Sequence, residues 1–496
     1  MLAAAVTLAA AVAPASAGPK SSGRFPETLP ALHAEPDPAD RGRIVDARGR
    51  EVLLRGINVD VLADLWRSSE LPTVQPFLPG DLALLRGMGF NVVRLQLSWS
   101  RIEPRPGAYD EAYLAEAERY IRTFRGAGMY TIVDLHQDAW GASLAARPGE
   151  QCPPGLQPAI GWDGAPAWAT LVADAVPRCF SQAREINPAV EAAWAALWDD
   201  APGPDTFGIR TRYASMLGHV ARRLSAHDSV AGYDVINEPA AFTPEHRAAL
   251  ADLYSSALRE IRAGERLAKA PPRLVLFQPD VRWSFRGRGA PPDFARDRDV
   301  VYAPHAYARP VGRSSFQVAR DEARQFGGAP VFIGEWGTEP DRGAEFSAHQ
   351  DLQDTFAVGS ALWTWREGCG SPRMFAAGPS AKPWGLYDVD CRWNATVNVR
   401  DRLARRLTRA YVRAAPGRLH GQRYAASSGR FSAAGEAPAG NEQTLLVFYP
   451  GSKHPEARFR ARGLTNLHAV RTPGEGRFVV AIPRGVWSLE IGPRLR

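Results

Sequence analysis

After residue 17 the sequence contains no uninterrupted apolar run of about 20 residues, the length that a membrane-spanning helix requires. It also lacks clusters of basic residues, although its formal net charge is +7. Neutralising a track of phosphates requires such clusters, so we expect no nucleic-acid partner. Weak attraction to an anionic membrane surface remains compatible with this charge. No Gly-rich phosphate-binding turn follows the first predicted strand, which argues against a doubly wound nucleotide-binding sheet.

Cysteine is scarce, with four residues in 496. Their spacings match no zinc site, so we predict no metal and no cofactor. Four cysteines in an exported protein suit two disulfides, for which three connectivities exist. Their order along the chain favours two local pairs, Cys152 with Cys179 and Cys369 with Cys391.

The N-terminal residues 1–17 form an apolar run that ends in Ala15-Ser16-Ala17, the small-residue pattern of a signal-peptide cleavage site. This pattern predicts a secreted, extracellular protein. The run has no Lys or Arg before it, and a short apolar membrane anchor is the alternative. Residues 18–42 are rich in Pro, Ser, Gly and Asp, and we expect them to form a linker without a core of its own.

Eight short β-type runs with helical patterns between them predict an α/β fold, a (β/α)8 TIM barrel over residues 43–415. A hairpin around Arg48-Gly49 precedes them and could close the bottom of the barrel. The predicted strands are Leu53–Asn58, Asn91–Ser98, Tyr130–His136, Gly232–Asn237, Arg273–Gln278, Val300–His305, Val331–Glu335 and Ala361–Trp365.

The sequence pattern changes from helical to β-type after the helix predicted for Val399–Arg413. Three β-type runs, Thr444–Tyr449, Phe478–Ile482 and Val486–Ile491, are separated by Gly, Pro and Asn. We therefore predict a C-terminal all-β sandwich domain over residues 416–496.

Polar and aromatic residues fall at the carboxyl ends of the predicted strands, which meet on one face of a barrel, where active sites lie. Any one of them has an ordinary structural explanation, such as a helix cap, an ion pair or core packing. Their joint placement instead predicts a site that binds and cleaves a substrate. The residues are Arg94, His136, Asp138, Asn237, Glu238, His305, Tyr307, Glu335, Trp363 and Trp365.

Glu238 and Glu335 follow strands four and seven and form the predicted catalytic pair. Glycosidic cleavage needs one carboxylic acid to protonate the leaving oxygen and a second carboxylate to attack the sugar or to activate water. We predict Glu238 as acid/base, with its pKa raised by burial and by Glu335, and Glu335 as nucleophile, held ionised by Tyr307 and Arg94. Asn237 would donate to the sugar 2-hydroxyl group, and a separation of about 5–5.5 Å between the carboxyl groups would dictate retention.

The insertion between His136 and Asn237 is far longer than a usual connection. One interpretation of its tryptophans is an apolar wall beside the leaving group, suited to a lipid. The other is that they pack the helices of the insertion. The tryptophans are Trp140, Trp162, Trp168, Trp194 and Trp198.

Two motifs make the chain resemble glycoside hydrolase family 5. They are Asn237-Glu238-Pro239, preceded by Gly232–Ile236, and Ile333-Gly334-Glu335-Trp336-Gly337, with His305-Ala306-Tyr307 between them. The resemblance implies a (β/α)8 barrel, an acid/base after strand four and a nucleophile after strand seven.

A narrower resemblance is to the endoglycoceramidases, which release the glycan of glycosphingolipids from ceramide. Arg55–Val59, Asp134–Asp138 and Gly161–Trp168 carry this resemblance, which covers about residues 43–420. It implies that His136 and Asp138 contact the sugar next to the scissile bond and that Trp168 helps to line the cleft. The segment Asp60–Asp64 lacks the lysine of better-known members, and Trp363–Pro372 looks closer to a subgroup acting on galactosylceramide-type and 6-gala-series substrates.

We therefore predict a retaining endo-β-glycosidase of glycosphingolipids that acts as a monomer. An endo-β-glucanase acting on polysaccharide is the alternative enzyme. A non-catalytic glycan-binding barrel is the alternative outside the enzymes, but such a protein has no need to keep both glutamates together with Asn237 and Tyr307.

Overall fold

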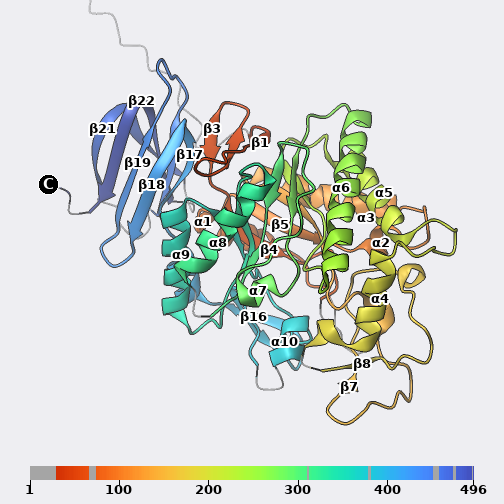
Figure 1. Ribbon diagram of the computed structural model, residues 1–496. Helices are drawn as coiled ribbons and strands as arrows, with labels where there is room; N and C mark the ends of the chain where they lie inside the picture. The colour runs from red at the N-terminus through yellow and green to blue at the C-terminus, as the bar shows by residue number, and fades with distance from the viewer. Residues whose placement is uncertain are drawn as a thin grey trace, which may run out of the picture.

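The computed structural model describes residues 29–65, 74–181, 183–309, 312–377, 381–450, 457–472, 476–493 and 495. It contains a parallel barrel and a large antiparallel sheet that lies beside it, with its C-terminal strands in blue and its N-terminal strands in red in Figure 1. The predicted signal peptide, residues 1–17, and the first part of the predicted linker lie outside the described residues. No helix within the described part of the chain combines the length and the apolar character needed to cross a membrane.

The barrel contains all eight predicted strands, which confirms the predicted fold class. Every strand pairs in parallel with its neighbour in the sheet. A parallel bridge between Tyr302 and Val331 joins the sixth strand to the start of the seventh and so closes the barrel. The sixth strand is interrupted and consists of two short pieces. In sheet order the strands are β11 (Val300–Tyr302), β10 (Leu274–Phe277), β9 (Val230–Asp234), β6 (Tyr130–Leu135), β5 (Val92–Leu97), β4 (Arg55–Val59), β14 (Gly359–Leu362), β13 (Phe332–Trp336) and β12 (His305–Ala306).

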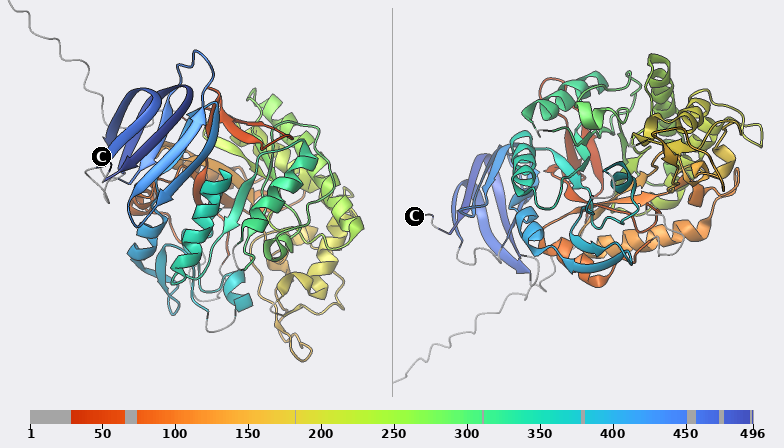
Figure 2. Two further views of the ribbon diagram at one scale, coloured as in Figure 1. Left: turned by 60° about the vertical axis from the view of Figure 1, so that its left-hand side comes forward. Right: turned by 90° about the horizontal axis from the view of Figure 1, so that it is seen from below.

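Helices surround the strands, as the two views of Figure 2 show. Local sequence explains where two long ones begin: Asp110 accepts hydrogen bonds from the first turn of α3, and Thr243 does so for α6, which has Pro244 at its first position. The helices are α1 (Pro79–Gly87), α2 (Trp99–Ile102), α3 (Glu111–Gly126), α4 (Pro188–Trp198), α5 (Ile209–Leu224), α6 (Pro244–Leu267), α7 (Trp283–Arg286), α8 (Arg313–Ala323), α9 (Gly343–Phe356), α10 (Pro372–Ala377) and α11 (Asp401–Leu407).

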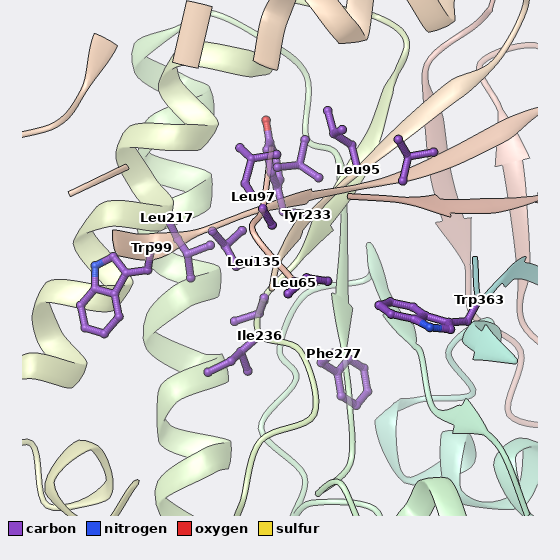
Figure 3. Packing of buried hydrophobic residues seen from close by; sticks show 14 of the residues in the cluster. Leu65, Leu95, Leu97, Trp99, Leu135, Leu217, Tyr233, Ile236, Phe277 and Trp363 are labelled. Carbon is purple, nitrogen blue, oxygen red and sulfur yellow. The ribbon is translucent and has the colours of Figure 1, made fainter. Parts of the chain in front are cut away.

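The core of the barrel lies between its strands and these helices. Leu97 of β5, Leu135 of β6 and Leu217 of α5 are fully or almost fully buried in it (Figure 3). Such strands are buried on both faces, which explains why they appear in the sequence as nearly continuous apolar runs. The core therefore holds the carboxyl ends of the strands in place.

A second sheet joins the two ends of the chain. In it the predicted hairpin, now β2 and β3, pairs with β1 on one side and with β17 on the other. Residues of this sheet share a core with the amino-terminal ends of the barrel strands, so the sheet covers the bottom of the barrel. Its strands are β1 (Leu32–Glu35), β2 (Arg43–Asp46), β3 (Arg50–Val52), β17 (Tyr411–Pro416), β18 (Arg418–Ala425), β19 (Arg430–Glu436), β20 (Leu445–Tyr449), β21 (Arg458–Thr472) and β22 (Gly476–Gly492).

Three boundary predictions are corrected by this sheet. Residues 32–35 form a strand with Leu32 and Ala34 buried, so the second half of the predicted linker belongs to the sheet. The helix predicted to reach Arg413 ends at Leu407, and strand β17 crosses the predicted domain boundary at 415. Tertiary pairing with β3 and β20 decides the conformation of β17, which helical periodicity alone cannot reveal.

The insertion after β6 packs around its own tryptophans, so the second interpretation of them is correct for four of the five. Trp140, Trp162, Trp194 and Trp198 are at most 3% exposed, and Trp194 stacks on Trp198 with ring centroids 5.2 Å apart. The insertion contains the short strands β7 (Gln157–Pro158) and β8 (Cys179–Phe180). The predicted aromatic wall beside the leaving group is therefore not built from these residues.

Both predicted disulfides are present. Cys152 bonds to Cys179 within the insertion, and Cys369 bonds to Cys391 after the last barrel strand. The second bond holds the segment that contains α10 against the hairpin of β15 (Tyr387–Asp390) and β16 (Ala395–Val399). Each disulfide thus stabilises a long connection at the carboxyl end of the barrel.

Candidate active site

A cavity of about 480 Å3 opens at the carboxyl ends of the barrel strands. This volume is typical of a site for a small molecule or part of a larger one. The cavity contains most of the predicted site residues together with several that were not predicted. It is lined by His136, Asp138, Arg184, Asn237, Glu238, Phe285, Tyr307, Ala308, Arg309, Glu335, Glu339, Trp363, Pro372, Arg373, Ala376, Ala377 and Trp384.

Glu238 and Glu335 face each other in this cavity. A carboxyl oxygen of Glu238 and one of Glu335 lie within 4.8 Å of each other. Retaining glycosidases hold their carboxyl groups about 5 Å apart, whereas inverting enzymes need about 6.5–9.5 Å to admit a water molecule. The separation therefore suits direct attack by one carboxylate on the sugar.

Glu335 is positioned from two sides. The Tyr307 hydroxyl donates to Oε2 at 2.9 Å, and the Arg94 guanidinium donates to Oε1 at 2.8 Å. Arg94 is completely buried and also donates to Asn58, Asp134, Asp234 and Asn237. One arginine thus connects five strands of the barrel and fixes the position of the Glu335 carboxylate, the partner that the sequence analysis predicted for it.

Replacing Arg94 with methionine is expected to lower the free energy of unfolding by about 3–5 kcal/mol, because buried carboxylates would lose their cation. Denaturant unfolding at neutral pH measures this loss. Arg296→Met is the control, since it breaks an exposed ion pair with Asp293 and an exposed hydrogen bond to the Ala295 backbone and should cost less than about 1 kcal/mol. Equal losses in the two variants would contradict the structural role of Arg94.

Glu238 is held at the other side of the cavity by three contacts. Its backbone N–H donates to Gln278 at 3.0 Å, and its Oε1 accepts from the Ser284 hydroxyl at 2.9 Å. The Nδ1 atom of His305 lies 3.0 Å from the same oxygen and 3.4 Å from Glu335. The backbone φ of Glu238 is 40°, a left-handed conformation that is costly for a residue with a side chain and that such contacts maintain.

The charge distribution in the ligand-free cavity differs from the prediction. Burial favours the protonated form of Glu238, but the hydrogen bond and charge of His305, then Arg184 and Ser284, lower its pKa to about 2. Burial raises the pKa of Glu335, although the charges of His305 and Arg94 oppose this. The lowered pKa of Glu238 differs from the prediction of a raised one, because His305 contacts both carboxyl groups, a bridge that the sequence does not reveal. Arg94 acts on the pKa of Glu335 in the predicted direction, although burial outweighs it.

His136 and Asp138 lie beside the catalytic pair. The imidazole of His136 is 2.7 Å from Asp134 and 3.3 Å from Asp138, and its ring stacks on Trp363 with centroids 5.6 Å apart. Asn237 turns its amide oxygen to Arg94, and its nitrogen donates to the backbone of residue 137. These side chains form one wall of the cavity, as predicted.

The stability of the protein should depend on the protonation of His136. Burial lowers its pKa, but the charges and hydrogen bonds of Asp134 and Asp138 raise it to about 10. Protonated His136 therefore stabilises the fold fully below its ordinary pKa of about 6.5, and this contribution is lost as the pH rises to about 10. We expect the stability difference between the wild type and His136→Gln in urea to shrink between about pH 6 and about pH 10. A constant difference would contradict this expectation.

Four predicted site residues do not line the cavity. Arg94 and His305 contact the two glutamates from behind its wall, whereas Trp365 and Trp168 lie apart from them. Trp365 is buried, packs against Phe77 at 5.2 Å and contacts Tyr387. Trp168 packs edge-on against Trp99 at 5.3 Å, and its indole N–H donates to the backbone of residue 103. Both belong to the packing of the loops that surround the site, since the chain turns away from the cavity at these residues.

Arg184, Ser284 and Trp384 are site residues that the sequence analysis missed. Arg184 donates to Asp138 at 2.6 Å, and Ser284 contacts the acid/base as described. Arg184 lies in a single 3-10 turn, Ser284 in the one-turn helix α7 and Trp384 in a connection without regular structure. None of these segments is long enough for a periodicity to mark a position. The sequence offers one signal of this part of the site. Phe285 stands next to Arg286 and close to Arg288, directly after Ser284 and beyond the fifth barrel strand.

Comparison with known proteins agrees with this geometry. The sequence model of the family described as cellulase (glycosyl hydrolase family 5) matches residues 45–367. An endoglycoceramidase I from Rhodococcus hoagii is 30% identical over 286 residues, an alignment that covers 55% of this chain and 53% of that protein. An endoglycoceramidase from Cyanea nozakii is 23% identical over 446 residues, 82% of each chain.

A solved structure described as an endogalactoceramidase is 33% identical to this chain, with a TM-score of 0.81. The match covers 93% of this chain and 99% of that one, so it includes the second sheet as well as the barrel. The family match covers more than half of the chain and contains both glutamates. The chain therefore belongs to glycosyl hydrolase family 5 and is a glycoside hydrolase.

Proposed function

We propose that this chain is a retaining endo-β-glycosidase that hydrolyses the bond between the glycan and the ceramide of glycosphingolipids. The observation that carries the proposal is the pair Glu238 and Glu335, with oxygens within 4.8 Å in a cavity that also contains Asn237. The names of the relatives above support ceramide as the leaving group.

The reaction follows from the positions of the two carboxyl groups. Glu335 attacks the anomeric carbon while Glu238 protonates the departing ceramide oxygen, which gives a covalent glycosyl-enzyme. Glu238 then removes a proton from water, and this water displaces Glu335 and restores the β configuration. Tyr307 and Arg94 keep Glu335 oriented for the attack.

Glu238 has to be protonated in the first step and ionised in the second. His305, Arg184 and Ser284 stabilise the ionised form of Glu238, which suits the second step. A bound apolar aglycone would exclude water from Glu238 and thereby favour the protonated form for the first step. His305 contacts both carboxyl groups and is placed to share a proton with Glu238.

Galactosylceramide-type glycolipids, including the 6-gala series, are the first substrates to test. The similarity to the endogalactoceramidase extends over 93% of the chain and supports this choice. The deciding experiment incubates the protein with a panel of glycosphingolipids in detergent and, separately, with soluble β-glucans, and identifies the products by mass. Intact oligosaccharide or sugar plus free ceramide is the expected result. Glucan fragments with untouched lipid would replace this function by that of an endo-β-glucanase.

We also propose that the protein is exported after cleavage behind Ala17. The pattern of residues 1–17 supports this, and the two disulfides suit an oxidising compartment. Expression in an exporting host should yield a secreted chain that begins at Gly18, as read by N-terminal sequencing. A cell-bound chain that keeps residues 1–17 would identify that segment as an anchor.

A further inference from the structure

A short segment at the edge of the cavity, residues 283–290, is held rigidly in place; we call it the rim segment. It comprises α7 and the turn that follows. Glu322 accepts hydrogen bonds from the Trp283 indole at 2.8 Å and from the Gly289 backbone at 2.6 Å, so it anchors both ends. The backbone of Tyr307 also donates to that of Ser284 at 3.0 Å.

The rim segment exposes apolar and basic groups that nothing in the fold requires. Phe285 is 70% exposed although it is a large aromatic residue. Arg286 and Arg288 are exposed, and within the described parts of the chain neither side chain has a hydrogen bond or an ion pair. Arg282 and Arg309, by contrast, pair with Asp280 and Glu339. Two cations without a partner in the described parts of the chain thus follow an exposed aromatic residue.

The rim segment lies next to Glu238, the residue that in the proposed reaction protonates the leaving group. Ser284 donates to Glu238, the residue that protonates the departing oxygen, and the next residue, Phe285, lines the same cavity. Figure 1 shows α7 toward the side of α10, away from the large antiparallel sheet. Phe285 therefore lines the cavity next to Glu238, which in the proposed reaction is the side of the leaving group.

We propose that the rim segment docks the enzyme on a phospholipid bilayer that contains anionic lipids. Phe285 enters the boundary between headgroups and acyl chains, and Arg286 and Arg288 bind lipid phosphates. This inference rests on the proposed function, because a ceramide aglycone has its scissile bond at headgroup level in a membrane. The docked segment brings Glu238 to that level.

The chemistry of the segment favours a bilayer over another polyanion. A soluble polyanion would be bound by the arginines but gains little from a lone exposed phenylalanine, whereas a bilayer interface accommodates both kinds of side chain. The rigid anchoring by Glu322 also means that little conformational entropy is lost when the segment docks.

Vesicle flotation tests the proposal without depending on catalysis. Vesicles of phosphatidylcholine with about one third phosphatidylglycerol should bind the wild type, and vesicles of pure phosphatidylcholine should bind it more weakly. Arg286→Glu combined with Arg288→Glu should weaken binding at least about 25-fold, because each arginine near an anionic surface contributes about a factor of five to the binding constant. Phe285→Ser should weaken it about tenfold.

Two control variants match these changes on other surfaces. Phe207→Ser removes a phenylalanine that is 56% exposed and does not line the cavity, and it should bind vesicles like the wild type. Arg458→Glu with Arg462→Glu makes the same charge change on the exposed face of β21 and should have little effect beyond long-range electrostatics. Loss of binding in this control but not in the rim variants would overturn the proposal and assign docking to β21.

Activity measurements separate this inference from the proposed function. The Arg286 and Arg288 double variant should cleave glycolipid in detergent micelles at the wild-type rate but lose activity on the same glycolipid in anionic vesicles in proportion to its lost binding. Wild-type protein that cleaves micellar glycolipid but does not bind anionic vesicles would overturn the docking alone. Vesicle binding without cleavage of any glycolipid would instead overturn the proposed function.

Discussion

Replacing Glu335 with alanine is expected to lower kcat at least about 10,000-fold, because the covalent step loses its nucleophile. Added azide should restore part of the activity by entering the space that the carboxylate leaves. Since azide would then attack from the side of Glu335, the product should be an α-glycosyl azide, inverted relative to the β-glycosidic substrate. Nuclear magnetic resonance of the isolated azide determines its configuration.

The control for this prediction is Glu345→Ala, a glutamate of α9 that accepts a hydrogen bond from Thr338 outside the cavity. Its kcat should stay within about twofold of the wild type. Full activity of Glu335→Ala, or a β-glycosyl azide from it, would remove Glu335 from the role of nucleophile. Circular dichroism of the variant verifies that its fold is intact.

Replacing Glu238 with alanine should have an effect that depends on the leaving group. Hydrolysis of a glycolipid, whose alkoxide needs a proton to depart, should slow by about 100- to 10,000-fold in kcat/KM. A dinitrophenyl glycoside departs without a proton, so its first step should be almost unchanged and the glycosyl-enzyme should accumulate as a burst of released phenol. Stopped-flow absorbance resolves the burst from the slow turnover that follows.

Azide distinguishes the two carboxyl groups. In Glu238→Ala it should attack the glycosyl-enzyme from the side opposite Glu335 and give a β-glycosyl azide, the opposite configuration to that from Glu335→Ala. Equal losses with the glycolipid and with the dinitrophenyl glycoside would contradict an acid role for Glu238. Ser284→Ala removes only the hydroxyl that contacts Glu238 and should cause a smaller loss with the glycolipid.

The convergence of the candidate catalytic residues could be predicted from the sequence because strand ends in a parallel barrel meet at one face. Glu238, Glu335 and Tyr307 each follow a recognisable apolar run, so their convergence needed no knowledge of side-chain geometry. Both disulfides were predicted for a similar reason, since each joins cysteines that are fewer than 30 residues apart.

Residues on long connections could not be placed in this way. Trp365 and Trp168 have the residue type of a sugar platform, yet their rings pack against Phe77 and Trp99. Arg184 and Phe285 reach the cavity from segments without periodicity. The direction of a loop depends on what it packs against, and local sequence carries little of that information.

The barrel, the presence of a second β-sheet and the meeting of Glu238 and Glu335 at one face could all be predicted from the sequence by itself, because hydrophobic periodicity and the order of strand ends are properties of the chain alone. Three further features emerged only from the folded chain: β1 and β17 belong to one sheet, four of the five tryptophans of the insertion are buried, and His305 bridges Glu238 and Glu335. These outcomes depend on contacts between residues far apart in sequence, and the energies of burial and of charge pairing that decide them exist only once the chain has brought those residues together.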